Sequence, residues 1–110
     1  MQVVLKQSQA EEPYSFTFVN DQGQSVVKSE NYKAKKSALG GIESVKKNCT
    51  NDDRYEMKES KNGKFFFNIK ASNGQVVGTS ALFASATERG KAIEELKSSA
   101  PGAAVTEQSS

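Results

Sequence analysis

The chain has 110 residues, enough for one domain with a single modest hydrophobic core. Its 35% hydrophobic and 25% charged residues are typical of a folded, soluble protein and exclude a disordered one. The formal net charge of +2 is too small to indicate a nucleic-acid or membrane partner by itself. No apolar run approaches the ~20 residues that a membrane span needs, so no membrane partner is expected.

Two residue counts limit the chemistry further. The chain contains no histidine, which excludes Ser–His and Cys–His nucleophile pairs, histidine general bases and most transition-metal sites. Its single cysteine, Cys49, excludes an intramolecular disulfide and fits a reducing compartment. The start of the chain, Met1–Lys6, reads as a strand and lacks the features of a signal peptide. We therefore expect a cytoplasmic protein without cofactors.

Three short strands are predicted at the beginning of the chain. In the second of them, Tyr14, Phe16 and Phe18 alternate with other residues, a period of two that is typical of a half-buried strand. Segments containing Pro or Gly separate the strands and predict two adjacent hairpins, which together form a meander. The three strands are expected at Gln2–Gln7, Tyr14–Val19 and Gln24–Ser29.

A helix is predicted after this meander. Leu39, Ile42 and Val45 form one apolar stripe at helical spacing. The cap position is Ala34, and the two lysines that follow it lie at the positive end of the helix dipole. Alanine is a poor cap and cations are unfavourable there, so we expect this helix to start late or to fray.

The second part of the chain is predicted to have the same order of elements. Its first turn contains Asn62-Gly63, the strongest two-residue hairpin signal, because both central positions of a type I′ turn need φ > 0. Ser85 and Glu88 have the spacing of a capping box and mark the start of a second helix. The strands before this helix are expected at Arg54–Glu59, Phe65–Ala71 and Gln75–Ser80.

Residues 16–46 match residues 67–97 at an offset of 51 residues. The first strands of the two halves match at an offset of 52 residues. One offset that holds through a strand, a turn and a helix indicates a tandem duplication. We expect a single domain over residues 1–110, with repeats at about 2–52 and 53–107 and a disordered tail at 108–110. Residues that match include Phe16 and Phe67, Gly23 and Gly74, Gly41 and Ala92, and Ile42 and Ile93.

The apolar periods suit an α+β fold, one antiparallel sheet with both helices packed on one face. The tail segment "AAVT" could add one short edge strand. Gly41 is explained by a close approach of the first helix to the sheet. Alternation places Thr17, Val27 and Phe66 on the opposite, open face. The expected core consists of Val3, Leu5, Phe16, Phe18, Val26, Leu39, Ile42, Val45, Met57, Phe67, Ile69, Val77, Ile93 and Leu96.

Both halves contain an F-x-F/I strand, an N/Q-G-Q turn and the helix motif G/A-I-E-x-V/L-K. These motifs resemble the YegP-like family of small, uncharacterised bacterial proteins, most densely over Arg54–Ser80, and the resemblance covers about residues 2–105. It implies two tandem β-β-β-α-β repeats in one sheet, with the C-terminal strands exchanged between repeats. It also implies a monomer, because single-repeat relatives would build the same object as a dimer. It implies no activity.

A lysine cluster is the strongest charged feature. Lys33, Lys35 and Lys36 gather at the predicted start of the first helix, where free amides also favour anions, so a phosphate or nucleic-acid backbone could bind there. The alternative interpretation is a solvated helix end. Phe66 and Lys70 on the open sheet face form a second candidate surface for nucleic acid. Platforms that bind single-stranded nucleic acids stack bases on two or three aromatic residues, whereas only Phe66 is available on this face.

No catalytic constellation emerges from the remaining candidates. Cys49 has no obvious base beside it and is interpreted as an incidental thiol. The carboxylate pairs Asp52-Asp53 and Glu94-Glu95 are interpreted as solvated charges, because neighbouring residues on a helix do not face each other. We therefore expect a small non-enzymatic binding or protein-interaction module of unknown partner. The alternative is weak anion or nucleic-acid binding through the lysine-rich helix start and the open sheet face.

Overall fold

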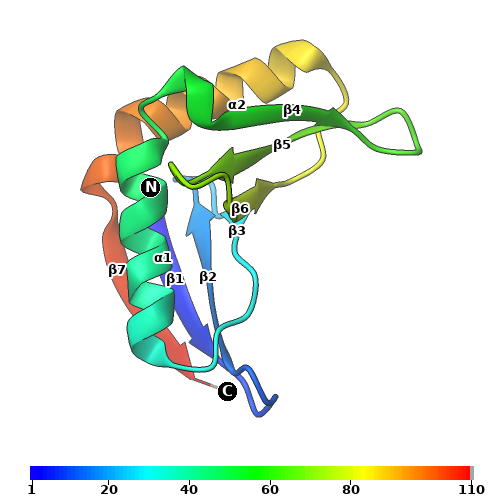
Figure 1. Cartoon of the computed structure of the whole chain (residues 1–110). Coiled ribbons are helices and arrows are strands. Elements are labelled where there is room, and N and C mark those ends of the chain that lie inside the picture. Colours follow the sequence, from blue (N-terminus) through cyan, green and yellow to red (C-terminus); the bar gives the residue numbers. More distant parts are fainter. Residues whose placement is uncertain (110) are drawn as a thin grey trace.

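Two copies of one β-β-β-α arrangement, followed by one last strand, build a seven-stranded sheet in the computed structural model, which describes residues 1–109 (Figure 1). The strand order is β4-β5-β6-β3-β2-β1-β7. All neighbours pair antiparallel except β1 and β7, so the sheet is mixed and not wholly antiparallel as expected. The elements are β1 (Gln2–Gln7), β2 (Tyr14–Val19), β3 (Ser25–Lys28), α1 (Lys35–Asn48), η1 (Asp52–Arg54), β4 (Tyr55–Glu59), β5 (Phe65–Lys70), β6 (Val76–Ser80), α2 (Ala86–Ser99), η2 (Ala100–Gly102) and β7 (Ala104–Ser109).

A local two-fold axis relates the repeats. In the pairing of β3 with β6, Lys28 directly faces Thr79, and these two residues are equivalent at the 51-residue offset. Residues that face each other in a sheet have side chains on the same side, so the axis is perpendicular to the sheet. Equivalent residues such as Phe16 and Phe67 therefore share one face. Both helices pack on that face, α1 against β2, β5 and β6, and α2 against β5.

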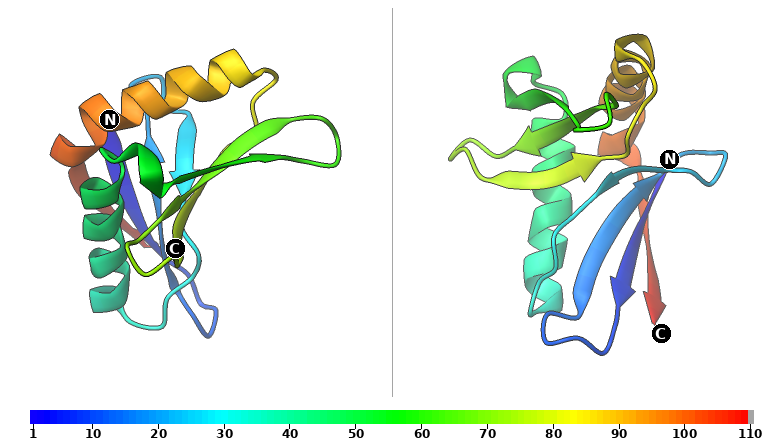
Figure 2. Two further views of the ribbon diagram at one scale, coloured as in Figure 1. Left: turned by 45° about the horizontal axis from the view of Figure 1, so that its top comes forward. Right: turned by 90° about the vertical axis from the view of Figure 1, so that its right-hand side faces the viewer.

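The last strand crosses from the second repeat to the first. β7 follows α2 but pairs with β1, at the opposite end of the sheet from β4. The chain that leaves α1 passes through η1 directly into β4 beside β5, so it forms no additional strand (Figure 2). β1 runs antiparallel to β2, and β7 runs parallel to β1, so both of these strands have the opposite direction to β2. Gln108 and Ser109, expected to be disordered, belong to β7, and Ser110 lies outside the described residues.

The core lies between the sheet and the helices. Phe16, Phe18, Phe67, Ile42, Ile69 and Leu96 are its largest fully buried side chains. The assignment of two residues to the core is wrong. Leu39, on the flank of α1, is 39% exposed, and Met57, on the end strand β4, is 52% exposed. Val77 is only half-buried.

Two residues expected on the open face are also buried, Val27 and Thr17. A bulge explains the first case. The register of β2 with β3 shifts after Phe18, so that both Val26 and Val27 turn into protected environments. Thr17 lies on a central strand between its larger neighbours Val4 and Lys28, which shield it.

The first helix does not start late. α1 begins at Lys35, the equivalent of the first residue of α2, Ala86, although Ala34 makes no side-chain cap. The buried face of α1 thus fixes its start without a cap, as tertiary packing commonly does. In α2 the expected cap is present. Ser85 Oγ accepts from the Glu88 amide at 3.1 Å, while the Glu88 carboxylate accepts from the Ala84 amide.

The close approach expected at Gly41 is confirmed. A Cβ atom on Gly41 would lie 2.5 Å from Tyr32 Oη and 2.9 Å from Phe16 Cε2. In the second repeat, Ala92 has this Cβ atom, and the ring beside it is Phe83, which has no hydroxyl group. The first repeat thus has the hydroxyl group of Tyr32 and no methyl group at position 41, whereas the second repeat has the methyl group of Ala92 and no hydroxyl group at position 83.

Candidate functional site

The lysine cluster is exposed but partly neutralised. Lys33, Lys35 and Lys36 lie at the start of α1, and Lys35 forms an ion pair with Glu107 of β7. The crossing strand therefore places a carboxylate where an anion was expected to bind. Phe66 and Lys70 lie on β5, in the other half of the sheet, so the structure does not bring the two candidate surfaces together.

Lys70 takes part in a polar network on the open face. Its Nζ lies 2.8 Å from Glu56 Oε2, and Asn68 Nδ2 donates to Glu56 Oε1 at 3.1 Å. The hydrogen bonds from Lys70 and then from Asn68 lower the pKa of Glu56 below its usual value. Phe66 is half-buried and faces Lys58 across the strands. One aromatic ring beside an engaged lysine does not form a base-stacking platform.

Cys49 is a core residue and not a surface thiol. It is fully buried at the end of α1, and its Sγ lies 3.7 Å from the carbonyl oxygen of Leu96 on α2. Burial raises the pKa of the thiol, which disfavours the reactive thiolate. Tyr55 Oη donates to the Cys49 carbonyl at 2.6 Å, and burial raises the pKa of Tyr55 as well.

Two of the acidic candidates, Asp52 and Glu94, contact the same lysine. Asp52 pairs with Lys97 of α2, and this contact raises the pKa of Lys97. Glu94 lies 3.7 Å from the same lysine. Within residues 1–109, no three His, Cys, Asp or Glu side chains lie close enough together to hold a metal ion.

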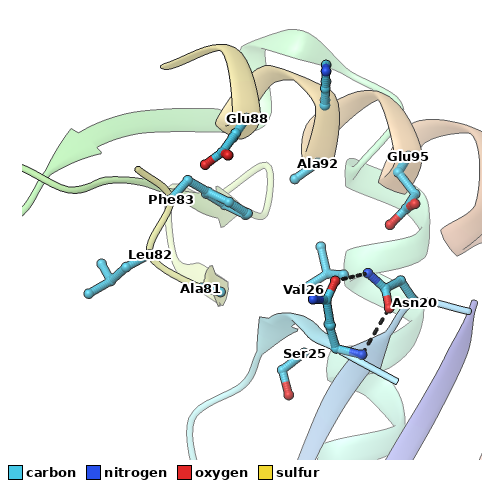
Figure 3. Close-up of a pocket in the computed structure, with 11 residues that line it drawn as sticks. Asn20, Ser25, Val26, Ala81, Leu82, Phe83, Glu88, Ala92 and Glu95 are labelled. Carbon is cyan, nitrogen blue, oxygen red and sulfur yellow. Dashed lines mark hydrogen bonds between the residues drawn. The ribbon is translucent and has the colours of Figure 1, made fainter. Parts of the chain in front are cut away.

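The structure has an open groove of about 480 Å³ that the sequence did not indicate (Figure 3). It lies between α2 and the turn that joins β2 to β3, so both repeats contribute to it. Phe83, Val26, Glu88 and Glu95 point into the hollow. Leu82 lies at its outer side and is 57% exposed. The groove thus combines an apolar floor with a wall of α2 that carries Glu88, Lys91 and Glu95.

The other wall of the groove is held by local hydrogen bonds. Asn20 Oδ1 accepts from the amides of Gln22 and Gln24, at 3.0 and 2.9 Å, and Asn20 Nδ2 donates to the side chain of Gln24 at 3.1 Å. These bonds fix the β2–β3 turn in place. Glu88 is fixed on the opposite wall by its bond to Ala84. The walls are therefore preformed, which lowers the entropic cost of binding.

A second groove, of about 410 Å³, lies at the position related by the local two-fold axis. Its residues Gly40, Ser44 and Ala71 are the equivalents of Lys91, Glu95 and Asn20. It has no matching pair of carboxylates. The signal that could have identified the first groove is the apolar pair Leu82-Phe83, which replaces Asn31-Tyr32 of the first repeat.

Comparisons with known proteins agree with the repeat architecture. The family model described as "Domain of unknown function (DUF1508)" matches twice, at residues 10–56 and 60–107. The UPF0339 protein in the ptx operon 5′ region of Stutzerimonas stutzeri is 50% identical over 94 residues, 86% of this chain and 85% of that protein. The UPF0339 protein YegP of Escherichia coli K12 is 40% identical over 84 residues, 76% of each chain.

Solved structures show the same fold. The solution NMR structure of yegP from E. coli superposes with a TM-score of 0.90 at 34% identity, covering 98% of this chain and 92% of that one. The solution NMR structure of UPF0339 protein SO3888 from Shewanella oneidensis gives 0.90 at 30% identity, covering 98% and 91%. No helix among the described residues is long and apolar enough to cross a membrane. The chain belongs to the DUF1508 family, of which it contains two tandem copies, and it resembles the UPF0339/YegP proteins of bacteria.

Proposed function

We propose that the chain is a non-enzymatic protein-interaction module that holds a segment of a partner protein in the groove between α2 and the β2–β3 turn. The observation that carries this proposal is the 57% exposure of Leu82 beside the apolar floor formed by Val26 and Phe83. Exposed apolar side chains at the margin of a hollow are a feature of protein-binding surfaces.

The charges of the groove specify the chemistry of the segment. Glu88 and Glu95 stand two helical turns apart on the same wall and both point into the hollow. Lys91 of the same lining lies about one helical turn from each of them, and a lysine or arginine of the segment would make charge-assisted hydrogen bonds with one of the two carboxylates. Apolar neighbours of that residue would cover Phe83 and Leu82. The proposed occupant is therefore a short partner segment with one basic residue flanked by apolar ones.

We also propose that the chain folds as a cytoplasmic monomer built of repeats at about 2–52 and 53–107. The pairing of β3 with β6 supports this, because it joins the two repeats within a single sheet. Anion or nucleic-acid binding at Lys33, Lys35 and Lys36 has less support, because Lys35 is paired with Glu107. An amide NMR titration with phosphate and short oligonucleotides at low salt tests it, and the amides of residues 33–40 should not shift.

Site-specific photo-cross-linking tests the groove. Benzoyl-phenylalanine in place of Leu82 should form an adduct with a partner protein in cells, whereas the same group in place of the exposed Lys61, in the β4–β5 turn, should not. Glu95→Lys should remove the adduct, and Glu94→Lys, its neighbour outside the groove lining, should retain it. Equal adducts from both positions, or an adduct that survives Glu95→Lys, would contradict the proposal. Substrate turnover lost in Glu95→Lys would contradict its non-enzymatic part.

A further inference from the structure

The equivalent strands β1 and β4 differ in what lies beside them. β1 is enclosed between β2 and β7, whereas β4 is the end strand of the sheet (Figure 1). Leu5 of β1 is 2% exposed, and its equivalent on β4, Met57, is 52% exposed. Within residues 1–109, no strand takes the place beside β4 that β7 takes beside β1. The repeat symmetry thus leaves one strand position vacant.

The main chain of β4 presents hydrogen-bonding groups to this position. On β5, the amides of Phe65 and Phe67 bond toward β6, to Phe83 O and Ser80 Oγ. Alternation along the strand then directs Phe66 and Asn68 toward β4, where they face Lys58 and Glu56. The amides and carbonyls of Tyr55, Met57 and Glu59 consequently point outward.

The edge is held in a fixed position by α2. Arg89 of α2 donates from Nη1 to the carbonyl oxygen of Lys58 at 3.1 Å, and its guanidinium lies 5.3 Å from the centre of the Phe65 ring. Both contacts anchor the β4–β5 hairpin to the helix. A strand that adds to this edge would therefore meet a preformed template.

The pairing of β7 with β1 shows what such a strand requires. On β1, the three central positions Val4, Leu5 and Lys6 face Thr106, Glu107 and Gln108. The equivalent positions on β4 are Glu56, Met57 and Lys58. Glu107 is matched by Lys35 of α1, but the equivalent of Lys35 on α2 is Ala86, so an apolar residue fits beside Met57. Glu56 is already paired with Lys70 at 2.8 Å and lies 3.9 Å from Lys58, so a basic residue beside Glu56 and an acidic one beside Lys58 would extend this set of alternating charges.

We propose that the outer edge of β4 binds an extended segment of a partner protein as an eighth strand, parallel to β4, with the pattern basic–apolar–acidic opposite Glu56, Met57 and Lys58. The partner is not β7 of a second copy, because β7 has Thr, Glu and Gln at these positions and is already paired with β1. This surface is distinct from the groove beside α2, and its failure would leave the proposed function of that groove untouched.

A designed peptide tests the proposal on the full chain. The probe has the sequence of Ala104–Ser109 with Thr106→Lys, Glu107→Leu and Gln108→Glu, and its ends are blocked. Titrated into the ¹⁵N-labelled protein, it should shift the amides of Tyr55, Met57 and Glu59 and leave those of the groove unchanged. A second peptide with its lysine and glutamate interchanged should bind about fivefold more weakly, because both cross-strand charge pairs become repulsive.

Two substitutions separate edge pairing from other modes of binding. Met57→Pro removes an outward amide, which an edge strand tolerates, and should abolish the shifts while core amides such as that of Phe67 stay at their positions. Met57→Ala keeps the amide and should retain binding. The proposal is overturned if the peptide causes no shifts, if it shifts β7 instead, or if Met57→Pro still binds. Shifts at β4 that depend on protein concentration without peptide would assign this edge to a second copy and overturn it as well.

Discussion

Gly41→Ala should destabilise the protein, and Tyr32→Phe should remove that effect. The new methyl group would lie 2.5 Å from Tyr32 Oη and 2.9 Å from Phe16 Cε2, both closer than van der Waals contact. Overpacking of this kind costs about 1–3 kcal/mol. Replacing Gly by Ala inside a helix contributes about 1 kcal/mol in the opposite direction. The single variant should therefore lose up to about 2 kcal/mol of unfolding free energy.

The second repeat provides the reason to expect rescue. There Ala92 coexists with Phe83 and Phe67, whose rings stack at 6.4 Å, as the rings of Tyr32 and Phe16 do at 6.2 Å. The double variant transfers this arrangement to the first repeat. Tyr32→Phe alone should change stability by about 0.5 kcal/mol or less, and the double variant should match or exceed the wild type. The coupling energy should then be about 1–3 kcal/mol, which is the overpacking cost that the double variant avoids.

Urea unfolding followed by circular dichroism measures this double-mutant cycle. The unfolding free energies of the wild type, both single variants and the double variant give the coupling directly. An equal loss from Gly41→Ala with and without the tyrosine hydroxyl would show that the hydroxyl is not the obstacle. A gain from Gly41→Ala alone would refute the close approach of α1 to the sheet.

Three further predictions concern the sheet centre and two ionisable groups. A Cβ on Gly78 would lie 2.6 Å from Val27 Cγ1, so Gly78→Ala should cost about 1–3 kcal/mol in urea unfolding, and adding Val27→Ala should recover part of the loss. The lowered pKa of Glu56 means that its contacts stabilise the fold above its unfolded pKa and that this contribution disappears as the pH falls through the folded pKa. The stability difference between wild type and Glu56→Gln should therefore be present at neutral pH and vanish in acid, once the pH lies below the folded pKa of Glu56. Cys49 should react with a thiol reagent only at the rate of unfolding, because it is 0% exposed; rapid labelling of the native protein would contradict its place in the core.

The sequence was sufficient for the repeat, the element order and most of the core. These features depend on local periodicity, on turn signals such as Asn62-Gly63 and on a constant offset between the two halves, all of which can be recognised from the order of residues alone. The capping box at Ser85 and the close packing of Gly41 were predicted for the same reason. Each follows from a residue type at one defined position in an element.

The errors arise where a residue's environment depends on segments distant in the chain. Simple alternation placed Val27 on the open face, but a bulge in the pairing of β2 with β3 turned it into the core. Met57 was assigned to the core by analogy with Leu5, yet the strand that covers Leu5 has no counterpart beside β4. The start of α1 was judged from Ala34 and the two lysines that follow it, whereas packing of its buried face decides it.

The groove was not predicted, because it too depends on segments that are distant in the chain. One side of the groove comes from β3 and the β2–β3 turn, and the other side comes from α2. These two parts lie about 60 residues apart in the sequence and meet only in the folded chain. Glu88 was recognised only as a capping residue and Glu95 only as a solvated charge. Their common orientation into one hollow requires the tertiary arrangement (Figure 3).

The most direct test of the proposed interaction is the identity of the segment cross-linked to position 82. Mass spectrometry of the adduct formed by benzoyl-phenylalanine at this position should locate one segment of one partner protein, with a lysine or arginine next to the linked residue. That adduct should disappear in Glu95→Lys and remain in Glu94→Lys. Adducts spread over unrelated proteins and sequences, with no dependence on Glu95, would contradict a binding groove beside α2.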